Sequence, residues 1–228
     1  MSDLPRILLV GATGLVAGHV LDHAVGRADM HMLALARGEV PLPHGARMEV
    51  LVAPVEGWED AIAAIAPDRV ICALGTTIAR TGGDKDAFAA VDRDLVLQLA
   101  RYSKAAGASS FAVISSVGAA KEARNFYLRT KGEMEAGLAK IGFARLDILQ
   151  PGLLRGARTG AIRPMERIAM VLAPLMDIFL QGERRKYRSI KAETVAAAAL
   201  QCAHEKARGT FVHQHDGILR LASRFSRS

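Results

Sequence analysis

Cysteine and aromatic residues are scarce in this chain of 228 residues. Its two cysteines, Cys72 and Cys202, lie far apart, so they form neither a Cys-x-x-Cys pair nor a disulfide framework. We therefore expect a reducing environment and a cytoplasmic location.

Apolar runs long enough to cross a bilayer are also missing. The longest run, Ile168–Leu180, is interrupted by Pro174 and Asp177, and it falls short of the roughly 20 residues that a spanning helix needs. The segment Met1–Arg6 lacks the basic flank and long apolar stretch of a signal peptide. The sequence therefore predicts neither a transmembrane segment nor secretion.

The composition excludes wholesale disorder, because 50% of the residues are hydrophobic and the mean hydropathy is +0.17. The net charge of +7 and a pI near 9.8 would suit an anionic ligand, nucleic acid or an acidic membrane. The basic stretch Arg184–Arg188 has only Tyr187 as an aromatic neighbour and matches no nucleic-acid motif. We interpret it as a solvated loop or a substrate-phosphate site, and we expect no specific nucleic-acid partner.

Short apolar runs alternate with helical patterns along the first two thirds of the chain. Expected strands are Arg6–Val10, His31–Ala36, Met48–Val52, Arg69–Leu74, Phe111–Ile114 and Arg145–Leu149, and expected helices are Leu15–Leu21, Trp58–Ala66, Lys85–Ala106 and Tyr127–Ile141. Parallel strands need such helical crossovers, because tight hairpins cannot join them. The pattern predicts an α/β fold with a doubly wound parallel sheet covered by helices on both faces.

After Pro151 the alternation loosens. An apolar helix near Met165–Leu180 and an alanine-rich helix over Ala192–Cys202 follow, with no repeat or flexible linker between them. We therefore expect one domain over residues 1–228, in which residues 151–228 contribute the substrate side and C-terminal additions.

A glycine-rich turn, Gly11-Ala-Thr-Gly14-Leu-Val-Ala17, joins the first strand to the first helix. This spacing lets the backbone approach a pyrophosphate at a helix N-terminus. Gly11 permits the tight turn, Gly14 removes a Cβ that would strike the phosphate, and Ala17 allows the helix to pack closely on the strand.

The second expected strand is followed by Arg37, where an acidic residue commonly holds a free ribose 2′-hydroxyl. A guanidinium suits a 2′-phosphate through paired, charge-assisted hydrogen bonds. The sequence therefore favours NADP(H) over NAD(H), although NAD(H) stays open and Arg37 is also compatible with a solvated surface position.

Tyr127 and Lys131 are four residues apart, on one face of a predicted helix. A phenol ionises only near pH ~10, but a neighbouring cation favours phenolate and makes proton transfer feasible. Ser115 and Ser116 follow the fifth strand, where they could hydrogen-bond a reacting carbonyl or hydroxyl. The sequence His213-Gln-His215 would put two imidazoles on one face of a strand, but we interpret it as a solvated strand and expect no metal site.

In their order and spacing, the glycine turn, the serine pair and Tyr127-x-x-x-Lys131 resemble the short-chain dehydrogenases/reductases. Further segments resemble the atypical branch that contains the Tat-interacting-protein-like oxidoreductases: Leu74-Gly-Thr-Thr77, Val91-Asp-Arg-Asp94, Ser115-Ser-Val-Gly-Ala119, Asn125-Phe-Tyr-Leu128, Lys131-Gly-Glu-Met-Glu135 and Pro151-Gly-Leu-Leu154. The resemblance covers Arg6 to Arg163. One departure is Gln150, which stands where the family commonly has arginine.

The resemblance implies a Rossmann-like domain that binds NADP(H). It implies that Tyr127 donates or accepts a proton, that Lys131 holds the nicotinamide ribose and favours the phenolate, and that Ser116 or Ser115 orients the substrate. The cofactor contacts that it implies are Thr13, Gly14, Leu15, Val16, Arg37, Leu74, Gly75, Leu154 and Arg163.

The sequence thus predicts an NADP(H)-dependent oxidoreductase that acts on a small carbonyl or alcohol, as a monomer or homodimer. Two alternatives stay open. One is an NADPH-sensing regulatory or scaffold protein without turnover, since a fold does not fix a function. The other is a nucleotide-sugar epimerase or dehydratase, which would use the same residues.

Overall fold

A seven-stranded sheet of order β3-β2-β1-β4-β5-β6-β9 runs through the molecule, and every neighbouring pair of strands is parallel. The computed structural model describes residues 4–156 and 180–227. The strands are β1 (Arg6–Val10), β2 (His31–Ala36), β3 (Glu49–Val52), β4 (Arg69–Cys72), β5 (Ser110–Ile114), β6 (Arg145–Leu149) and β9 (Gly209–His213). Strand order reverses between β1 and β4, which confirms the doubly wound, Rossmann-like sheet.

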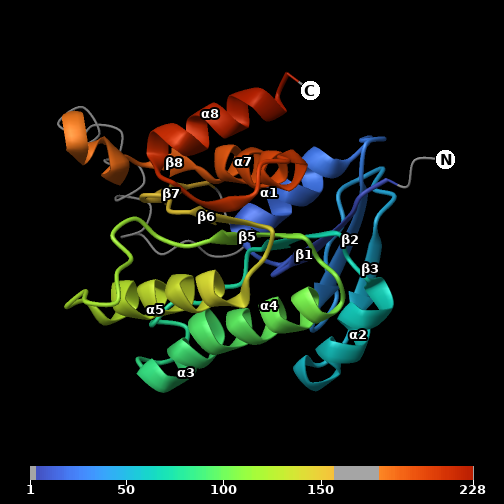
Figure 1. Cartoon of the computed structure of the whole chain (residues 1–228), viewed down its shortest axis with the longest axis horizontal. Coiled ribbons are helices and arrows are strands. Elements are labelled where there is room, and N and C mark those ends of the chain that lie inside the picture. Colours follow the sequence, from blue (N-terminus) through green and yellow to red (C-terminus); the bar gives the residue numbers. More distant parts are fainter. Residues whose placement is uncertain (1–3, 157–179, 228) are drawn as a thin grey trace.

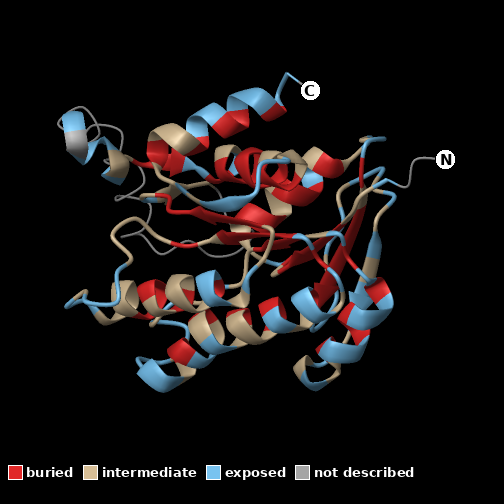
Figure 2. Ribbon diagram, in the orientation of Figure 1, coloured by how far each residue is buried: buried red, intermediate tan, exposed pale blue. Residues whose placement is uncertain are grey.

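Helices cover both faces of the sheet (Figure 1). One layer contains α1 (Leu15–Ala24), α7 (Ala192–His204) and α8 (His215–Phe225); the other contains α2 (Trp58–Ile65), α3 (Lys85–Ala89), α4 (Val96–Ala105) and α5 (Phe126–Ile141). Figure 2 shows the buried residues concentrated in the sheet and on the helix sides that face it.

Alternation along the central strands divides the apolar side chains between two cores. In β1, Ile7 and Leu9 belong to the core under α1 and α7, whereas Leu8 and Val10 belong to the core under α2, α4 and α5. All four side chains are fully buried. A strand covered on both faces reads as a continuous apolar run, which is why the sequence located it so well.

Helix α7 is buried on nearly all sides, because it packs against α1, α8 and the sheet. Because its alanine side chains are small, these neighbouring elements can pack closely around it. Those with no exposed surface are Ala192, Ala196, Ala198 and Ala199.

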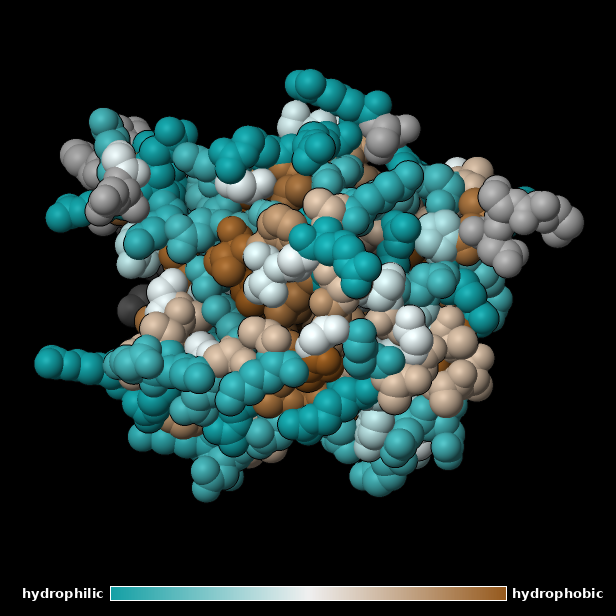
Figure 3. Space-filling view, in the orientation of Figure 1, coloured by the Kyte–Doolittle hydropathy of each residue, from teal (hydrophilic) through white to brown (hydrophobic). Residues whose placement is uncertain are grey.

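The surface seen in Figure 3 is mostly hydrophilic, with apolar side chains showing mainly near its middle. Among the residues that the structure describes, no helix is long and apolar enough to cross a membrane.

Several local predictions need correction. Residues 85–105 are helical as expected, but a π-helical segment, η2 (Ala90–Leu95), separates α3 from α4. The sequence did not indicate that β9 joins the sheet, or that β7 (Leu154–Arg155) pairs with β8 (Ile190–Lys191). Part of the basic stretch forms a 3-10 helix, η3 (Gly182–Tyr187). Residues 165–179 of the expected apolar helix lie outside the described residues, as does Arg163.

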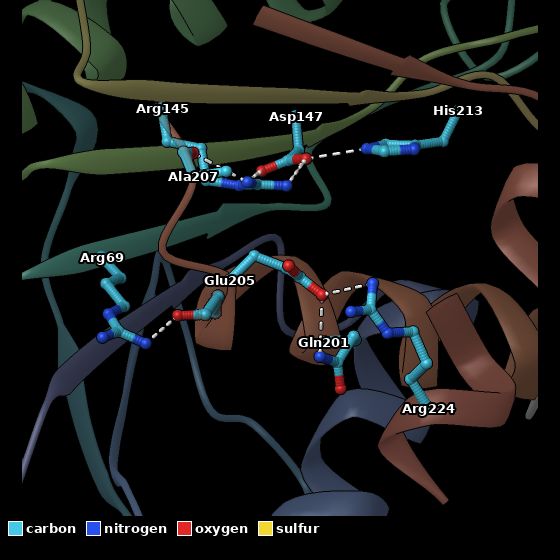
Figure 4. A network of polar contacts seen from close by, with 9 residues as sticks. Arg69, Arg145, Asp147, Gln201, Glu205, Ala207, His213 and Arg224 are labelled. Atoms are coloured by element: carbon cyan, nitrogen blue, oxygen red, sulfur yellow. Dashed lines mark hydrogen bonds and ion pairs between the residues drawn. The ribbon is translucent and has the colours of Figure 1, made fainter. Parts of the chain in front are cut away.

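A buried ion pair reinforces the junction of β6 and β9 (Figure 4). Arg145 donates to both carboxylate oxygens of Asp147, from Nε at 2.6 Å and from a terminal nitrogen at 2.7 Å. It also donates to the carbonyl of Ala207 and lies over the ring of Phe211. His213 Nε2 lies 2.7 Å from Asp147 Oδ1, so the two strands share one polar network.

Cys202 completes this cluster, because the ligand atoms of Asp147, Cys202 and His213 lie within 4.8 Å of one another. Such a grouping could hold a metal ion. However, Arg145 already occupies both oxygens of Asp147, and its guanidinium would repel a cation placed there. The cluster therefore fits a structural network better than a metal site. His215 is not part of it, because that residue begins α8 and pairs with Asp216.

Arg145→Ala should destabilise the fold by about 3–5 kcal/mol, because it leaves the carboxylate of Asp147 buried with its main counter-charge removed. Arg224→Ala is the matched control: the Arg224 side chain is 63% exposed and pairs with Glu205, so its loss should cost no more than ~1 kcal/mol. Urea unfolding of both variants measures the difference. Equal losses would show that the buried pair adds nothing beyond an ordinary surface contact.

Candidate functional site

The turn after β1 lies directly against the loop after β4. Gly11 has φ +90°, and a Cβ built on it would lie 2.6 Å from the carbonyl carbon and oxygen of Ala73 and 2.7 Å from the nitrogen of Leu74. Only glycine fits both the conformation and the space. The two loops therefore meet at the carboxyl ends of β1 and β4, the switch point where doubly wound sheets bind ligands.

Helix α1 begins at this turn, with Gly14 as its N-cap. Gly14 supplies no side-chain cap, and the first turn of α1 carries no acidic residue. The free N–H groups and the helix dipole therefore favour an anion at this end. Thr13 is exposed, whereas Val16 is 5% exposed and packs in the core, so Val16 can contact a ligand there only through its backbone.

The other expected cofactor residues flank the same edge. Arg37 is exposed immediately after β2, next to β1 in the sheet. Leu74 and Gly75 lie in the loop after β4, and Leu15 begins α1. Gly156, just after Leu154 and β7, lies so close to α1 that a Cβ on it would be 3.2 Å from Leu15 Cδ1. These residues lie around the glycine turn at one edge of the sheet, and we call them the cradle.

Helix α5 carries Tyr127 and Lys131 to this edge. Asn125 starts the helix, because its side-chain oxygen accepts the N–H of Leu128 at 3.1 Å. Tyr127 is half-buried, and its ring packs on Phe88 of α3 with centroids 5.6 Å apart. Lys131 lies one turn further along and is almost fully buried.

The ammonium of Lys131 is held by a residue that the sequence had not singled out as functional. Asp92 Oδ1 lies 2.7 Å from Lys131 Nζ, and Asp92 Oδ2 accepts the N–H of Thr76 at 2.7 Å. The loop after β4 passes close to this pair, since a Cβ built on Gly75 would lie 3.4 Å from Asp92 Oδ1 and 4.0 Å from Lys131 Nζ. A lysine ammonium has three donors, and the contact with Asp92 uses one of them.

The two serines differ in their surroundings. Ser115 is buried, and its hydroxyl donates to Glu135 Oε1. Ser116 is half-buried and follows it in the loop toward α5. The hydroxyl of Ser115 is therefore already engaged within the protein.

Glu135 is the second site residue that the sequence reasoning missed. It lies two turns after Tyr127 on α5. Each of its carboxylate oxygens accepts a hydrogen bond from Gln150 Nε2 at 3.0 Å. Burial raises the pKa of the Glu135 carboxyl, while hydrogen bonds from Ser115 and Gln150 and the charge of Lys131 act in the opposite direction. Gln150, the residue that departs from the resemblance, thus donates to a carboxylate.

Comparison with known proteins identifies the family. The NAD(P)H-binding family matches residues 11–206, so the chain belongs to that family. This match and the fold confirm the expected atypical short-chain dehydrogenase/reductase.

Curated relatives include proteins named "Protein fmp52, mitochondrial". The one from Emericella nidulans is 32% identical over 75% of this chain and 75% of its own length, and the one from Aspergillus niger is 30% identical over 86% of each. The Saccharomyces cerevisiae protein is 35% identical over 68% of each. These names contradict the expected cytoplasmic location, which rested on cysteine usage alone; a reducing environment does not specify a compartment.

Solved structures show the same fold. A Bacillus halodurans protein, proposed as an NAD-dependent epimerase/dehydratase, has a TM-score of 0.69 and 22% identity, covering 96% of this chain and 99% of that one. UDP-glucose 4-epimerase from Thermotoga maritima has a TM-score of 0.67 and 16% identity, covering 97% of this chain and 82% of that one.

Gly11→Ala should abolish measurable NADP(H) binding, because its Cβ would overlap the backbone of Ala73 and force the two loops apart. Gly18→Ala is the control: a Cβ on Gly18, in α1, meets nothing within 4 Å, so this helical change should stabilise the protein by up to ~1 kcal/mol. Calorimetric titration and thermal unfolding measure both effects. Retained affinity in Gly11→Ala would contradict the assigned cradle.

Proposed function

We propose that this protein is an NADP(H)-dependent oxidoreductase that interconverts a small carbonyl compound and its alcohol. The observation that carries the proposal is the placement of Lys131. Its buried ammonium lies beside the loop after β4 and one helical turn from Tyr127, at the edge of the sheet where the glycine turn would hold the pyrophosphate.

The preference for NADP(H) rests on Arg37. Its guanidinium is exposed at the carboxyl end of β2, where the adenosine ribose of a dinucleotide on the glycine turn would lie. A planar guanidinium binds a phosphate with two hydrogen bonds and a full charge. Phosphate on the 2′ position is the feature that distinguishes NADPH from NADH.

Lys131 would hold the nicotinamide ribose of a bound cofactor, which in the direction of reduction would supply a hydride to the carbonyl carbon. Tyr127 then gives its phenolic proton to the carbonyl oxygen, which takes the bond's electron pair as the alcohol forms. Lys131 stabilises the phenolate that remains until solvent restores the proton. Ser116 is the group that we assign to hold the carbonyl oxygen toward the phenol.

Arg37→Ala should weaken NADPH binding by about 10- to 100-fold, the loss expected for hydrogen bonds to a charged group, and should leave NADH binding nearly unchanged. Arg101→Ala removes an equal charge from an exposed position on α4 and should change neither affinity. Calorimetric titration of both cofactors provides the measurement. Equal affinities for NADPH and NADH in the parent protein would refute the assigned preference.

Tyr127→Phe should leave NADPH affinity nearly unchanged and reduce turnover by roughly 10²- to 10⁴-fold, as expected for lost acid/base catalysis. Tyr102→Phe is the control, because that phenol is bonded to Gln98 on α4. The assay screens small aldehydes and ketones and follows oxidation of NADPH.

The outcomes that contradict this proposal favour the alternative functions. Tight NADPH binding without turnover of any carbonyl would favour the regulatory or scaffold protein. Conversion of a nucleotide sugar without net oxidation of NADPH would favour the epimerase. Parent-like turnover in Tyr127→Phe would exclude the assigned proton transfer.

A further inference from the structure

The short strands β7 and β8 carry two cations side by side. The strands are parallel (Figure 1), and Arg155 of β7 stands in register with Lys191 of β8. The preceding register pair, Leu154 and Ile190, packs in the apolar core under α1 and α7. Because successive residues of a strand point to opposite faces, Arg155 and Lys191 share the face turned away from that core.

The guanidinium of Arg155 lacks an acceptor within the described part of the chain. Arg155 is half-buried, and its buried Nε has no hydrogen-bond partner there. Within the same residues, neither Arg155 nor Lys191 forms an ion pair with a carboxylate. Like charges directly opposite on neighbouring strands are destabilising, and buried polar groups almost always have partners. The two features together point to a ligand that supplies the acceptor.

The residue after Arg155 lies between two helix N-termini. A Cβ built on Gly156 would lie 3.2 Å from Leu15 Cδ1 and 3.5 Å from Ala192 Cβ, and these are the first residues of α1 and α7. Neither helix has a side-chain cap, so free N–H groups and helix dipoles add positive potential here. Glu193 in the first turn of α7 is exposed and, in the described structure, pairs with neither cation.

A hydrogen bond connects this region to the loop that carries the serine pair. The N–H of Val117 donates to the carbonyl of Pro151 at 3.0 Å, so the loops after β5 and β6 meet shortly before β7 begins. Arg155 therefore lies along the chain between Pro151, which is bonded to the serine loop, and Gly156, which packs on α1. These are the parts of the site that we assign to substrate and to cofactor.

We propose that Arg155 and Lys191 bind an oxyanion, a carboxylate or a phosphate, carried by the carbonyl substrate. The guanidinium donates from its planar fork, and the ammonium adds a point charge at the exposed side of the pair. This inference rests on the proposed reductase and makes its substrate class more specific: a carbonyl compound with a negatively charged group away from the reacting carbon.

The first test measures binding without turnover. Succinate and inorganic phosphate, neither of which NADPH can reduce, are titrated calorimetrically into the full chain with and without NADPH. Arg155→Met should weaken binding of the preferred anion by about 10- to 100-fold, the loss expected for hydrogen bonds to a charged group. Lys191→Met should weaken it by roughly 2- to 5-fold, because its ammonium is exposed. Lys206→Met removes an exposed cation beyond the other end of α7 and should bind like the parent.

Thermal unfolding separates a binding role from a structural one. Methionine keeps the apolar stem of arginine but removes the charge, so Arg155→Met without ligand should unfold at the parent temperature or above it. Arg155→Lys keeps the charge without the planar fork and should recover only part of the anion affinity. A clearly lower unfolding temperature in Arg155→Met would indicate a structural role and would contradict the proposal.

Three binding results would overturn the proposal. In the first, the parent binds neither succinate nor phosphate. In the second, Arg155→Met binds the preferred anion as tightly as the parent does. In the third, Arg155→Met loses NADPH affinity while its anion affinity is unchanged, which would assign the guanidinium to the cofactor.

Paired carbonyl compounds provide the test by turnover. Succinic semialdehyde is compared with butyraldehyde, and glyceraldehyde phosphate with glyceraldehyde. The parent should favour the charged member of one pair by about 10-fold or more in kcat/KM, and Arg155→Met should lose that preference mainly through KM. The preferred pair identifies the anion as carboxylate or phosphate.

The anion site and the reductase fail separately. Anion binding that depends on Arg155, without turnover of any carbonyl, would refute the reductase and leave the anion site standing. Turnover in which the uncharged members match the charged ones would refute the anion site and leave the reductase standing.

Discussion

The site depends on how closely two backbone segments can approach each other. Because Gly11 has no Cβ, the turn after β1 can lie against the backbone of Ala73 and Leu74. This approach brings the N-terminus of α1 and the loop after β4 together at one edge of the sheet. The same loop then reaches Asp92 through Thr76, and Asp92 holds Lys131. One continuous series of contacts thus joins the glycine turn to Lys131.

The sequence predicted the inner part of the sheet well, because strands buried on both faces are mainly apolar. Strands β1, β2 and β6 match their expected ranges, since each begins at a polar residue and is followed by glycine or a polar residue. Strand β9 was not recognised as part of the sheet, because Gly209–His213 is a partly exposed edge strand without a continuous apolar run. The expected strand to Leu74 ends at Cys72, where the chain bends toward Gly11.

In the candidate site, the sequence spacing predicted which residues share a helix face, but it did not predict contacts between different helices. Tyr127 and Lys131 are one helical turn apart, so their shared face follows from the helix alone. Glu135 continues that spacing by another turn and was recognisable by the same rule. The partner of Lys131 could not be identified in this way, because Asp92 reaches it only after the π-helical segment and α5 have packed together. Likewise, nothing in the serine pair indicates that Ser115 is bound to Glu135.

The small side chains of α7 limit which substitutions this fold can accept. Its buried alanines allow α1, α8 and the sheet to close around it without leaving space for larger side chains. Enlarging a side chain in a filled interior forces neighbouring elements apart and typically costs about 1–3 kcal/mol. We therefore expect larger side chains at these alanines of α7 to be poorly tolerated, whereas substitutions at exposed positions of α8 should cost little.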